Sequence, residues 1–277
     1  MAEEEGNPGA PSPADGADRP AQAEPGRGTP VDAAAAGTGT AGEKTSETKT
    51  RILEAAVAEF AADGLAGART EKIAAAAGVN KALLYYYFES KEKLYMAALE
   101  MSAARIRDTS MALFLSQATA GERLLRVALN HFDRILAQQE FQSLLQQEMV
   151  RVHKGESSAL PMFAKRAFEP VMIMYRSMVR EGIASGELID ADWLQMHMAM
   201  LGANVFYFLS APIWQMTLGE DMLTTEALTT RRKAVMDFLG QAIFVDRKHG
   251  TELAAKVFAE TPMPEIGDIR KGFGRAE

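Results

Sequence analysis

Two short helical patterns separated by a tight turn occupy residues 69–94, and they constrain the fold more than any other part of the chain. Apolar residues recur at helical spacing on both sides of the turn, which gives each short helix one apolar face. These residues are Ile73, Ala74 and Ala77 before the turn and Leu84 and Phe88 after it. In the turn, Gly78 suits the positive φ at which the first helix must end, and Asn80 can cap the second by accepting a backbone hydrogen bond. The pattern predicts a helix-turn-helix, whose second helix presents its N-terminal residues to DNA bases.

The start of this second helix carries the residues that we expect to meet DNA. On this interpretation Lys81, Ala82 and Leu83 are exposed at its N-terminus. An aromatic run at 85–88 then covers more than one face of a helix. Phe88 is predicted to be core, whereas the tyrosine rings can pack while their hydroxyls reach phosphate oxygens. Isolated lysines and tyrosines are usually only a solvated surface, but a helix N-terminus attracts phosphate through its free N–H groups and its dipole.

A wider pattern surrounds this motif. It comprises Arg51 to Ala56 and Phe60 in a first helix, Gly64 at its end, Ile73, Ala74 and Ala77 to Val79 in the second helix and the turn, Leu84 to Tyr86 and Phe88 in the third, and Ser90 to Glu92 opening a fourth. Through these residues the segment from Thr48 to Leu99, about a fifth of the chain, resembles the DNA-binding domain of the TetR family of bacterial transcriptional regulators. The resemblance implies an all-α fold, with a three-helix helix-turn-helix domain followed by a helical ligand-binding and dimerisation domain.

The resemblance also implies a set of DNA contacts, in which the start of the third helix faces the groove and Tyr85, Tyr86 and Lys91 contact phosphates. Two positions depart from the family pattern. Arg69 stands where the family usually has a capping Ser or Thr, with Thr70 one place later, and Tyr87 stands where the family often has His. The DNA-binding candidates are Arg69, Thr70, Asn80, Lys81, Ala82, Leu83, Tyr85, Tyr86 and Lys91.

Charge restricts how the chain could bind DNA. The formal net charge is -7, which argues against a general nucleic-acid coat. From Thr48 to Leu99, seven basic residues face six acidic ones, a net charge of +1. Because this electrostatic footprint is weak, binding should need a homodimer on two palindromic half-sites and should fall steeply with added salt.

The first 47 residues contain no Leu, Ile, Phe, Tyr or Trp and hold six of the 11 prolines. Such a composition cannot bury enough apolar surface to order itself, so residues 1–46 are predicted to form a disordered tail. A solubilising role is favoured; the alternative is that its end, near Lys44 and Lys49, lies in the minor groove. The tail lacks the apolar centre of a secretory signal, and the chain has no cysteine, which is compatible with a reducing cytoplasm.

From about Gly121 onward the pattern stays helical, and no two-residue periodicity suggests strands. The helices are predicted near residues 122–137, 139–153, 161–184, 191–211 and 225–246. The predicted domains are a DNA-binding domain at 47–107, an effector-binding and dimerisation domain at 108–247, and a C-terminal tail at 248–277, with a short helix followed by loose chain.

The uncharged stretch from Trp193 to Gly219 is long enough to span a membrane. It is interrupted by Gln195, His197, Asn204 and Pro212, and both of its flanks are acidic, whereas an anchored helix normally has Lys or Arg on one side. We therefore predict a helix buried between protein layers and no membrane partner. The TetR resemblance implies that this helix and the one after it form a four-helix dimer interface.

Eleven of the 16 methionines lie between positions 149 and 236, among many aromatic residues. A lining of Met and aromatic side chains can adapt to varied apolar ligands, although such residues also fill ordinary cores and most are assigned there. The resemblance places an effector pocket in the second domain. The lining candidates are Met172, Tyr175, Met178 and Phe206, and the predicted effector is small and apolar.

The favoured function is a transcriptional repressor that a small apolar effector releases from a palindromic operator, with activation left open. One alternative is a DNA-targeted enzyme with a helical catalytic domain, but the sequence has no nucleophile elbow, phosphate loop, HExxH pair or cofactor fingerprint. We therefore predict no catalytic residue, no cofactor and no metal site, and interpret each of the four histidines as a surface or satisfied core residue. The other alternative is a helical protein-interaction module, which would be monomeric and would not bind DNA.

Overall fold

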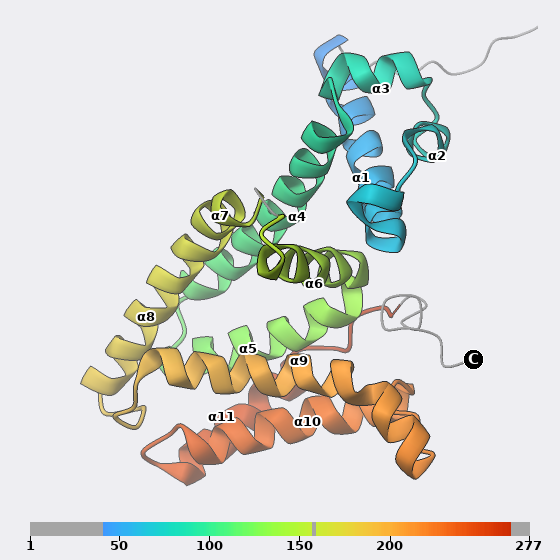
Figure 1. The fold of residues 1–277 in the computed structure, drawn as a ribbon. Helices are drawn as coiled ribbons and strands as arrows, with labels where there is room; N and C mark the ends of the chain where they lie inside the picture. The colour runs from blue at the N-terminus through green and yellow to red at the C-terminus, as the bar shows by residue number, and fades with distance from the viewer. Residues whose placement is uncertain (1–40, 157–158, 267–277) are drawn as a thin grey trace, which may run out of the picture. The chain divides into compact units, whose positions relative to one another are not determined.

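The computed structural model describes residues 41–156 and 159–266, and these ranges are helical nearly throughout (Figure 1). In chain order the helices are α1 (Ala41–Gly67), α2 (Thr70–Ala76), α3 (Lys81–Phe88), α4 (Lys91–Phe114), α5 (Ala120–Ala137), α6 (Gln139–His153), α7 (Leu160–Phe163), the π-helical turn η1 (Ala164–Phe168), α8 (Glu169–Ala184), α9 (Trp193–Leu218), α10 (Thr225–Ala242) and α11 (Arg247–Glu260). Within the same ranges, strand-like pairing is confined to an isolated bridge between Leu188 and Phe244. The predicted all-α fold is confirmed.

The first bundle consists of α1 to α4 around a shared apolar core. Ile52, Phe60, Ile73 and Leu84, one or two from each of the first three helices, are fully buried in it. The ring of Phe60 meets that of Tyr95 on α4 edge to face, with centroids 5.0 Å apart. The apolar periodicity read from the sequence therefore marks the faces that build this core.

Helix α4 continues without a break from the first bundle into the second (Figure 1). Its side chains up to Ile106 join the first core, whereas Phe114 joins a second core formed with α5, α8, α10 and α11. The domain boundary predicted at 107/108 therefore falls inside one helix, between residues that face different cores.

Helix α6 also joins the two bundles, because it packs against α1. Gly64 has φ 68° and interrupts the helical path of α1 just after Ala61. The Ala61 carbonyl accepts hydrogen bonds from Ser143 Oγ at 3.0 Å and Gln147 Nε2 at 2.9 Å, both on α6. Helix α6 is therefore attached directly to α1 of the first bundle.

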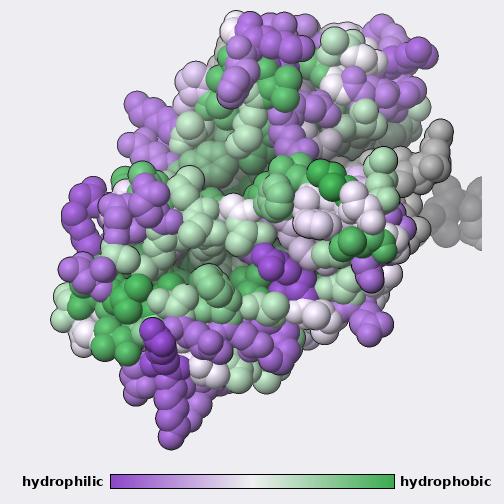
Figure 2. All heavy atoms as spheres, turned by 60° about the horizontal axis from the view of Figure 1, so that its bottom comes forward, coloured by the Kyte–Doolittle hydropathy of each residue, from purple (hydrophilic) through white to green (hydrophobic). Residues whose placement is uncertain are grey.

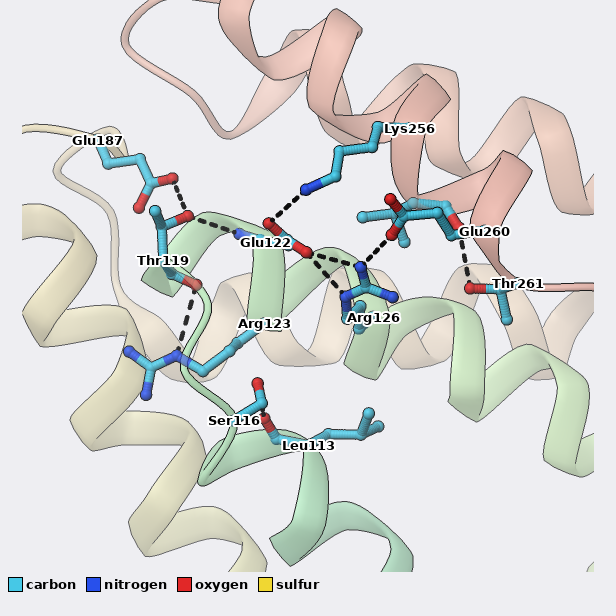
Figure 3. Close-up of polar contacts among 11 residues, drawn as sticks. Leu113, Ser116, Thr119, Glu122, Arg123, Arg126, Glu187, Lys256, Glu260 and Thr261 are labelled. Carbon is cyan, nitrogen blue, oxygen red and sulfur yellow. Dashed lines mark hydrogen bonds and ion pairs between the residues drawn. The ribbon is translucent and has the colours of Figure 1, made fainter.

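The second bundle is organised around α5, which contacts α8, α9, α10 and α11. Thr119 caps α5, since its hydroxyl accepts from the Glu122 N–H at 3.2 Å, and the same hydroxyl donates to Glu187 at 2.6 Å (Figure 3). Lys256 on α11 reaches the Glu122 carboxylate at 3.2 Å (Figure 3). These polar contacts fix the start of α5 against the loop after α8 and against α11.

Some element boundaries differ from those predicted. Of the predicted disordered tail, residues 1–40 lie outside the described residues, whereas 41–46 already form the first turns of α1. A carboxylate in the first turn, Glu43, favours this early start through the helix dipole. The predicted helix at 161–184 is divided by η1, just before Pro170, whose missing N–H cannot continue α-helical bonding.

Helix α9 was predicted to end at 211, but it runs through Pro212 to Leu218. Proline removes one backbone hydrogen bond, and the helix ends only where Gly219 adopts a left-handed conformation with φ 71°. Within the predicted C-terminal tail, the short helix is confirmed as α11. It packs closely along α10, where a Cβ on Gly250 would lie 2.2 Å from the Gly240 carbonyl oxygen. Residues 267–277 of that tail lie outside the described residues.

Candidate nucleic-acid interface and effector site

Helices α2 and α3 meet through the predicted tight turn. Gly78 has φ 66°, a conformation that residues with a side chain rarely adopt. Asn80 caps α3, since its side-chain oxygen accepts a hydrogen bond from the Leu83 N–H at 2.7 Å. Both predictions for the turn are confirmed, and together these residues fix the direction in which α3 leaves α2.

One side of α3 is exposed at its start. Asn80, Lys81 and Ala82 are exposed, Leu83 is half-buried, and Tyr86, one turn further, is 79% exposed. The opposite side of α3 is anchored by the buried Leu84 and Phe88. Of the α3 residues that were assigned to DNA, those at the helix start and Tyr86 are therefore accessible, whereas Leu83 and Tyr85 are only partly exposed.

Lys81 is not a free cation, because its ammonium forms an ion pair with the carboxylate of Glu71 on α2. The hydrogen bond and charge of Glu71 raise the pKa of Lys81, and the same hydrogen bond with Lys81 lowers the pKa of Glu71. The ammonium also lies 5.8 Å from the centre of the Tyr85 ring. A phosphate that binds Lys81 must therefore compete with Glu71, a residue that the sequence interpretation did not single out.

Two further candidates pair with each other rather than facing outward. The hydroxyls of Thr70 and Tyr85 lie 3.3 Å apart, and Thr70 is only 6% exposed. The buried Thr70 hydroxyl on α2 therefore orients the hydroxyl of Tyr85 on α3. Arg69 is exposed and precedes α2 without making a side-chain cap; its backbone N–H donates to Glu59 at 3.0 Å.

Lys91 lies in the first turn of α4, next to the cap formed by Ser90, whose hydroxyl accepts from the Lys93 N–H at 3.1 Å. The Lys91 ammonium donates to the carbonyl of Ala66 at 3.1 Å, which holds it against the end of α1. The structure therefore gives Lys91 an intramolecular partner at the position where a phosphate contact was predicted.

Family comparisons cover both bundles. A model described as bacterial regulatory proteins, tetR family, matches residues 52–98, and one described as the tetracyclin repressor-like C-terminal domain matches residues 121–239. The chain belongs to the TetR family. It is a DNA-binding transcriptional repressor with an effector-binding C-terminal domain, and the TetR-family regulators are transcription factors, not enzymes.

Individual relatives agree with this assignment. The transcriptional repressor NicS of Pseudomonas putida is 28% identical over 174 residues, which cover 63% of this chain and 81% of NicS. The regulator RutR of Escherichia coli is 48% identical over 62 residues, but these cover only 22% of this chain and 29% of RutR. The higher identity with RutR applies only to this short segment.

Solved structures share the fold at low sequence identity. A transcriptional regulator from Saccharomonospora viridis, in complex with choline, superposes with a TM-score of 0.56 at 22% identity, over 72% of this chain and 98% of that one. A gamma-butyrolactone receptor gives a TM-score of 0.53 at 20% identity, over 78% and 99% of the two chains. These structures support the TetR fold of both bundles.

The TetR effector-domain candidates do not all lie together. Tyr175 and Met178 on α8 are buried in the second core, and Met172 packs at its edge. Phe206 on α9 is 63% exposed, so it faces away from the core that holds the other three.

A group of buried polar side chains from α5, α8 and α9 lies in the same bundle. The rings of Tyr175 and His197 are 4.5 Å apart, and the Asn204 side-chain nitrogen is 3.2 Å from Nδ1 of His131. Nδ1 of His197 is buried without a hydrogen-bond partner in the described structure, so the prediction that every histidine is satisfied or on the surface was wrong for His197. The signal was the seven-residue spacing of His197 and Asn204, which places two polar residues on one face of an apolar helix.

Proposed function

We propose that this TetR-family repressor binds a palindromic operator as a homodimer and leaves it when a small effector enters the second bundle of each protomer. The observation that supports the proposal is the exposed start of α3, where Asn80, Lys81 and Ala82 are accessible at a capped helix N-terminus. Two such helices about 34–36 Å apart would enter successive major grooves. An effector that prefers the splayed dimer would shift the population away from DNA.

The dimer is supported by the apolar face of α9 and α10. Large apolar side chains are exposed along α9, namely Leu194, Met198, Phe206, Leu209, Ile213, Trp214, Met216 and Leu218. Phe238 on α10 is 67% exposed, and with residues of α9 it lines a groove of about 470 Å³ between the two helices. Figure 2, which turns this side toward the viewer, shows apolar side chains spread over it. A monomer rarely exposes such a continuous apolar surface to water.

Helix α9 is also, among the described residues, the one that is long and apolar enough to cross a membrane by length and composition. In the structure it packs on α5 and α8, and its polar residues His197 and Asn204 are buried against them. A second copy of the chain explains its remaining apolar surface without a membrane. We propose that the dimer works in the cytoplasm.

We propose domain boundaries close to those predicted. Residues 47–107 would bind DNA, and residues 108–247 together with α11 would bind the effector and form the dimer. The effector would lie among Met172, Tyr175 and Met178 on α8, and most of its surface would be apolar. Phe206 fits the dimer face better than this pocket because it is exposed on α9.

Signal transfer would pass through α6. This helix follows α5 after one residue, Gln138, and it is hydrogen-bonded to the Ala61 carbonyl of α1. Tyr95 on α4 also donates to Glu148 of α6 at 2.7 Å in a buried contact. A shift at the end of α5 would thus move the helices that carry α3, which is a physical route for the two-state change.

The Lys81→Ala variant tests the DNA contact. We expect about a 10-fold loss of operator affinity for each half-site, because a major-groove or phosphate contact of the α3 N-terminus is removed. The measurement is a gel-shift or anisotropy titration with a palindromic operator selected from genomic fragments. Lys256→Ala is a matched control, because both lysine side chains are 51% exposed and ion-paired, but Lys256 lies on α11. Equal affinity of Lys81→Ala and wild type would contradict the assigned contact, provided that the variant remains dimeric.

The Glu71→Gln variant should have the opposite effect. Removing the carboxylate frees Lys81 for phosphate, so operator affinity should rise about 3-fold or more, with a steeper salt dependence. Titrations at several salt concentrations measure both effects. Glu252→Gln on α11 serves as the control, since this glutamate is 68% exposed against 63% for Glu71 and is likewise paired with a lysine. If Glu71→Gln binds no more tightly than Glu252→Gln, the competition between Glu71 and DNA is refuted.

A further inference from the structure

Arg134, on the last turn of α5, is a mostly buried cation that has no counter-ion among the described residues. Within the part of the chain that the structure describes, its Nε is buried without a hydrogen-bond partner, and its Nη1 donates to the Ser110 hydroxyl at 3.3 Å. No carboxylate lies within ion-pair distance of it in the ranges 41–156 and 159–266. Burial lowers the pKa of Arg134 to about 10, so the group is still charged at neutral pH. A buried charge without a partner is costly, which points to an anion that binds there.

Further polar groups that lack partners among the described residues lie in the same bundle and connect to this arginine through His131. His131, one turn earlier on α5, interacts electrostatically with both Arg134 and His197. Beyond these residues, Oη of Tyr175 and Oδ1 of Asn204 are also buried without hydrogen-bond partners within the described structure. Tyr175 and Asn204 are each 0% exposed. These side chains come from α5, α8 and α9, so the group lies inside the second bundle and not on its surface.

The character of this group favours a negatively charged ligand. Burial above all lowers the pKa of His131 to about 3 and that of His197 to about 4, so both rings are neutral at physiological pH. The arginine is then the positive charge of the group, and the unpartnered Tyr175 hydroxyl and His197 Nδ1 can act as neutral donors. A guanidinium with additional neutral donors matches the two oxygens of a carboxylate.

The surroundings of the group are apolar. Met178 and Met200, from α8 and α9, are nearly buried in the second core, and Met172 packs at the edge of that core. Flexible methionine side chains can rearrange around an apolar body of varied shape. We propose that the effector is a small organic carboxylate with an apolar body, and that Arg134, assisted by Tyr175, His131 and His197, binds its carboxylate. This inference rests on the proposed function and specifies the class of its effector.

The position of Arg134 also suits regulation. It lies a few residues before α6 begins at Gln139, and α6 is hydrogen-bonded to α1 of the DNA-binding bundle. A bound carboxylate that attracts the Arg134 guanidinium would shift the C-terminal turn of α5. This shift would change how α6 packs against α1.

The Arg134→Met variant tests the unpaired charge without any ligand. If the arginine is kept for binding, replacing it with an apolar side chain of similar length should raise the melting temperature of the free protein. Arg232→Met is the matched control, because Arg232 is 3% exposed but forms two 2.7 Å bonds with Asp133. That variant should lose about 10 °C, since it strands the buried Asp133. A fall in melting temperature for Arg134→Met would show a structural role, for example at the helix C-terminus, and would overturn the proposal.

The second measurement uses octanoate and benzoate as probes, each beside its neutral amide, octanamide or benzamide. At least one carboxylate should raise the melting temperature of the wild-type protein above the effect of its amide, and Arg134→Met should abolish the difference. Tyr175→Phe removes only an unpartnered hydroxyl, so it should fold normally and reduce the carboxylate shift. Equal effects of acids and amides, or a shift that survives Arg134→Met, would refute carboxylate binding.

Operator binding separates this inference from the proposed function. Without carboxylate, wild type and Arg134→Met should bind the operator equally, and the stabilising carboxylate should release only the wild type. A dimer that binds the operator but ignores both acids refutes the effector class and leaves the repressor proposal standing. A chain that binds no operator at all refutes the proposed function itself.

Discussion

A Phe238→Glu chain should be a folded monomer that has lost operator binding. Phe238 is 67% exposed on α10 at the groove between α9 and α10, so its ring makes little contribution to the core of one protomer. In a symmetric dimer, each new carboxylate would be buried against apolar surface and close to its own copy, and the cost of burying it would separate the subunits. A monomer engages one half-site at a time, so operator affinity should fall at least about 100-fold.

Light scattering after size exclusion measures the mass, and an anisotropy titration measures the operator affinity. Leu115→Glu is the control, because Leu115 is equally apolar and 66% exposed but lies at the end of α4, away from the α9 and α10 face. It should remain dimeric with wild-type affinity. A dimeric Phe238→Glu protein would place the interface elsewhere, and a monomer with full operator affinity would remove the need for two joined half-sites.

The DNA-binding bundle was predictable because its determinants are local. A glycine that permits positive φ, an asparagine that caps the next helix and apolar residues at helical spacing act within a few residues of one another, and Gly78, Asn80 and Leu84 perform these roles. Two of the candidates, Thr70 and Lys91, have intramolecular partners that the sequence does not show. Such partners depend on which helices cross, and this is decided by the packing of the whole bundle.

The second bundle was less predictable for the same reason. The orphaned hydroxyl of Tyr175 and the unpaired guanidinium of Arg134 become visible only when α5, α8 and α9 are assembled, since the residues are far apart in the sequence. The methionine and aromatic content of the sequence indicates the apolar lining of this bundle but not the polar side chains that are buried with it. The predicted end of α9 at residue 211 was wrong because Pro212 removes only one backbone hydrogen bond, and this loss does not end a helix that packs along its length.

Stability of the second bundle should depend strongly on Asp133. Its two carboxylate oxygens each accept a 2.7 Å hydrogen bond from Arg232, which is 3% exposed and also donates to the Thr261 carbonyl at 2.9 Å. Asp133→Ala leaves this guanidinium buried without a counter-charge, which should cost about 3–5 kcal/mol of unfolding free energy. The melting temperature at fixed protein concentration should fall by about 10 °C.

Two further variants identify the cause of that loss. Asp108→Ala removes an exposed aspartate paired with Arg107, and it should leave the melting temperature unchanged because solvent screens such a pair. Combining Asp133→Leu with Arg232→Met removes both charges and keeps apolar volume, so it should recover most of the lost stability. If the double variant is no more stable than Asp133→Ala, lost packing and not an uncompensated charge causes the effect; if Asp133→Ala melts like wild type, the pair does not stabilise the bundle.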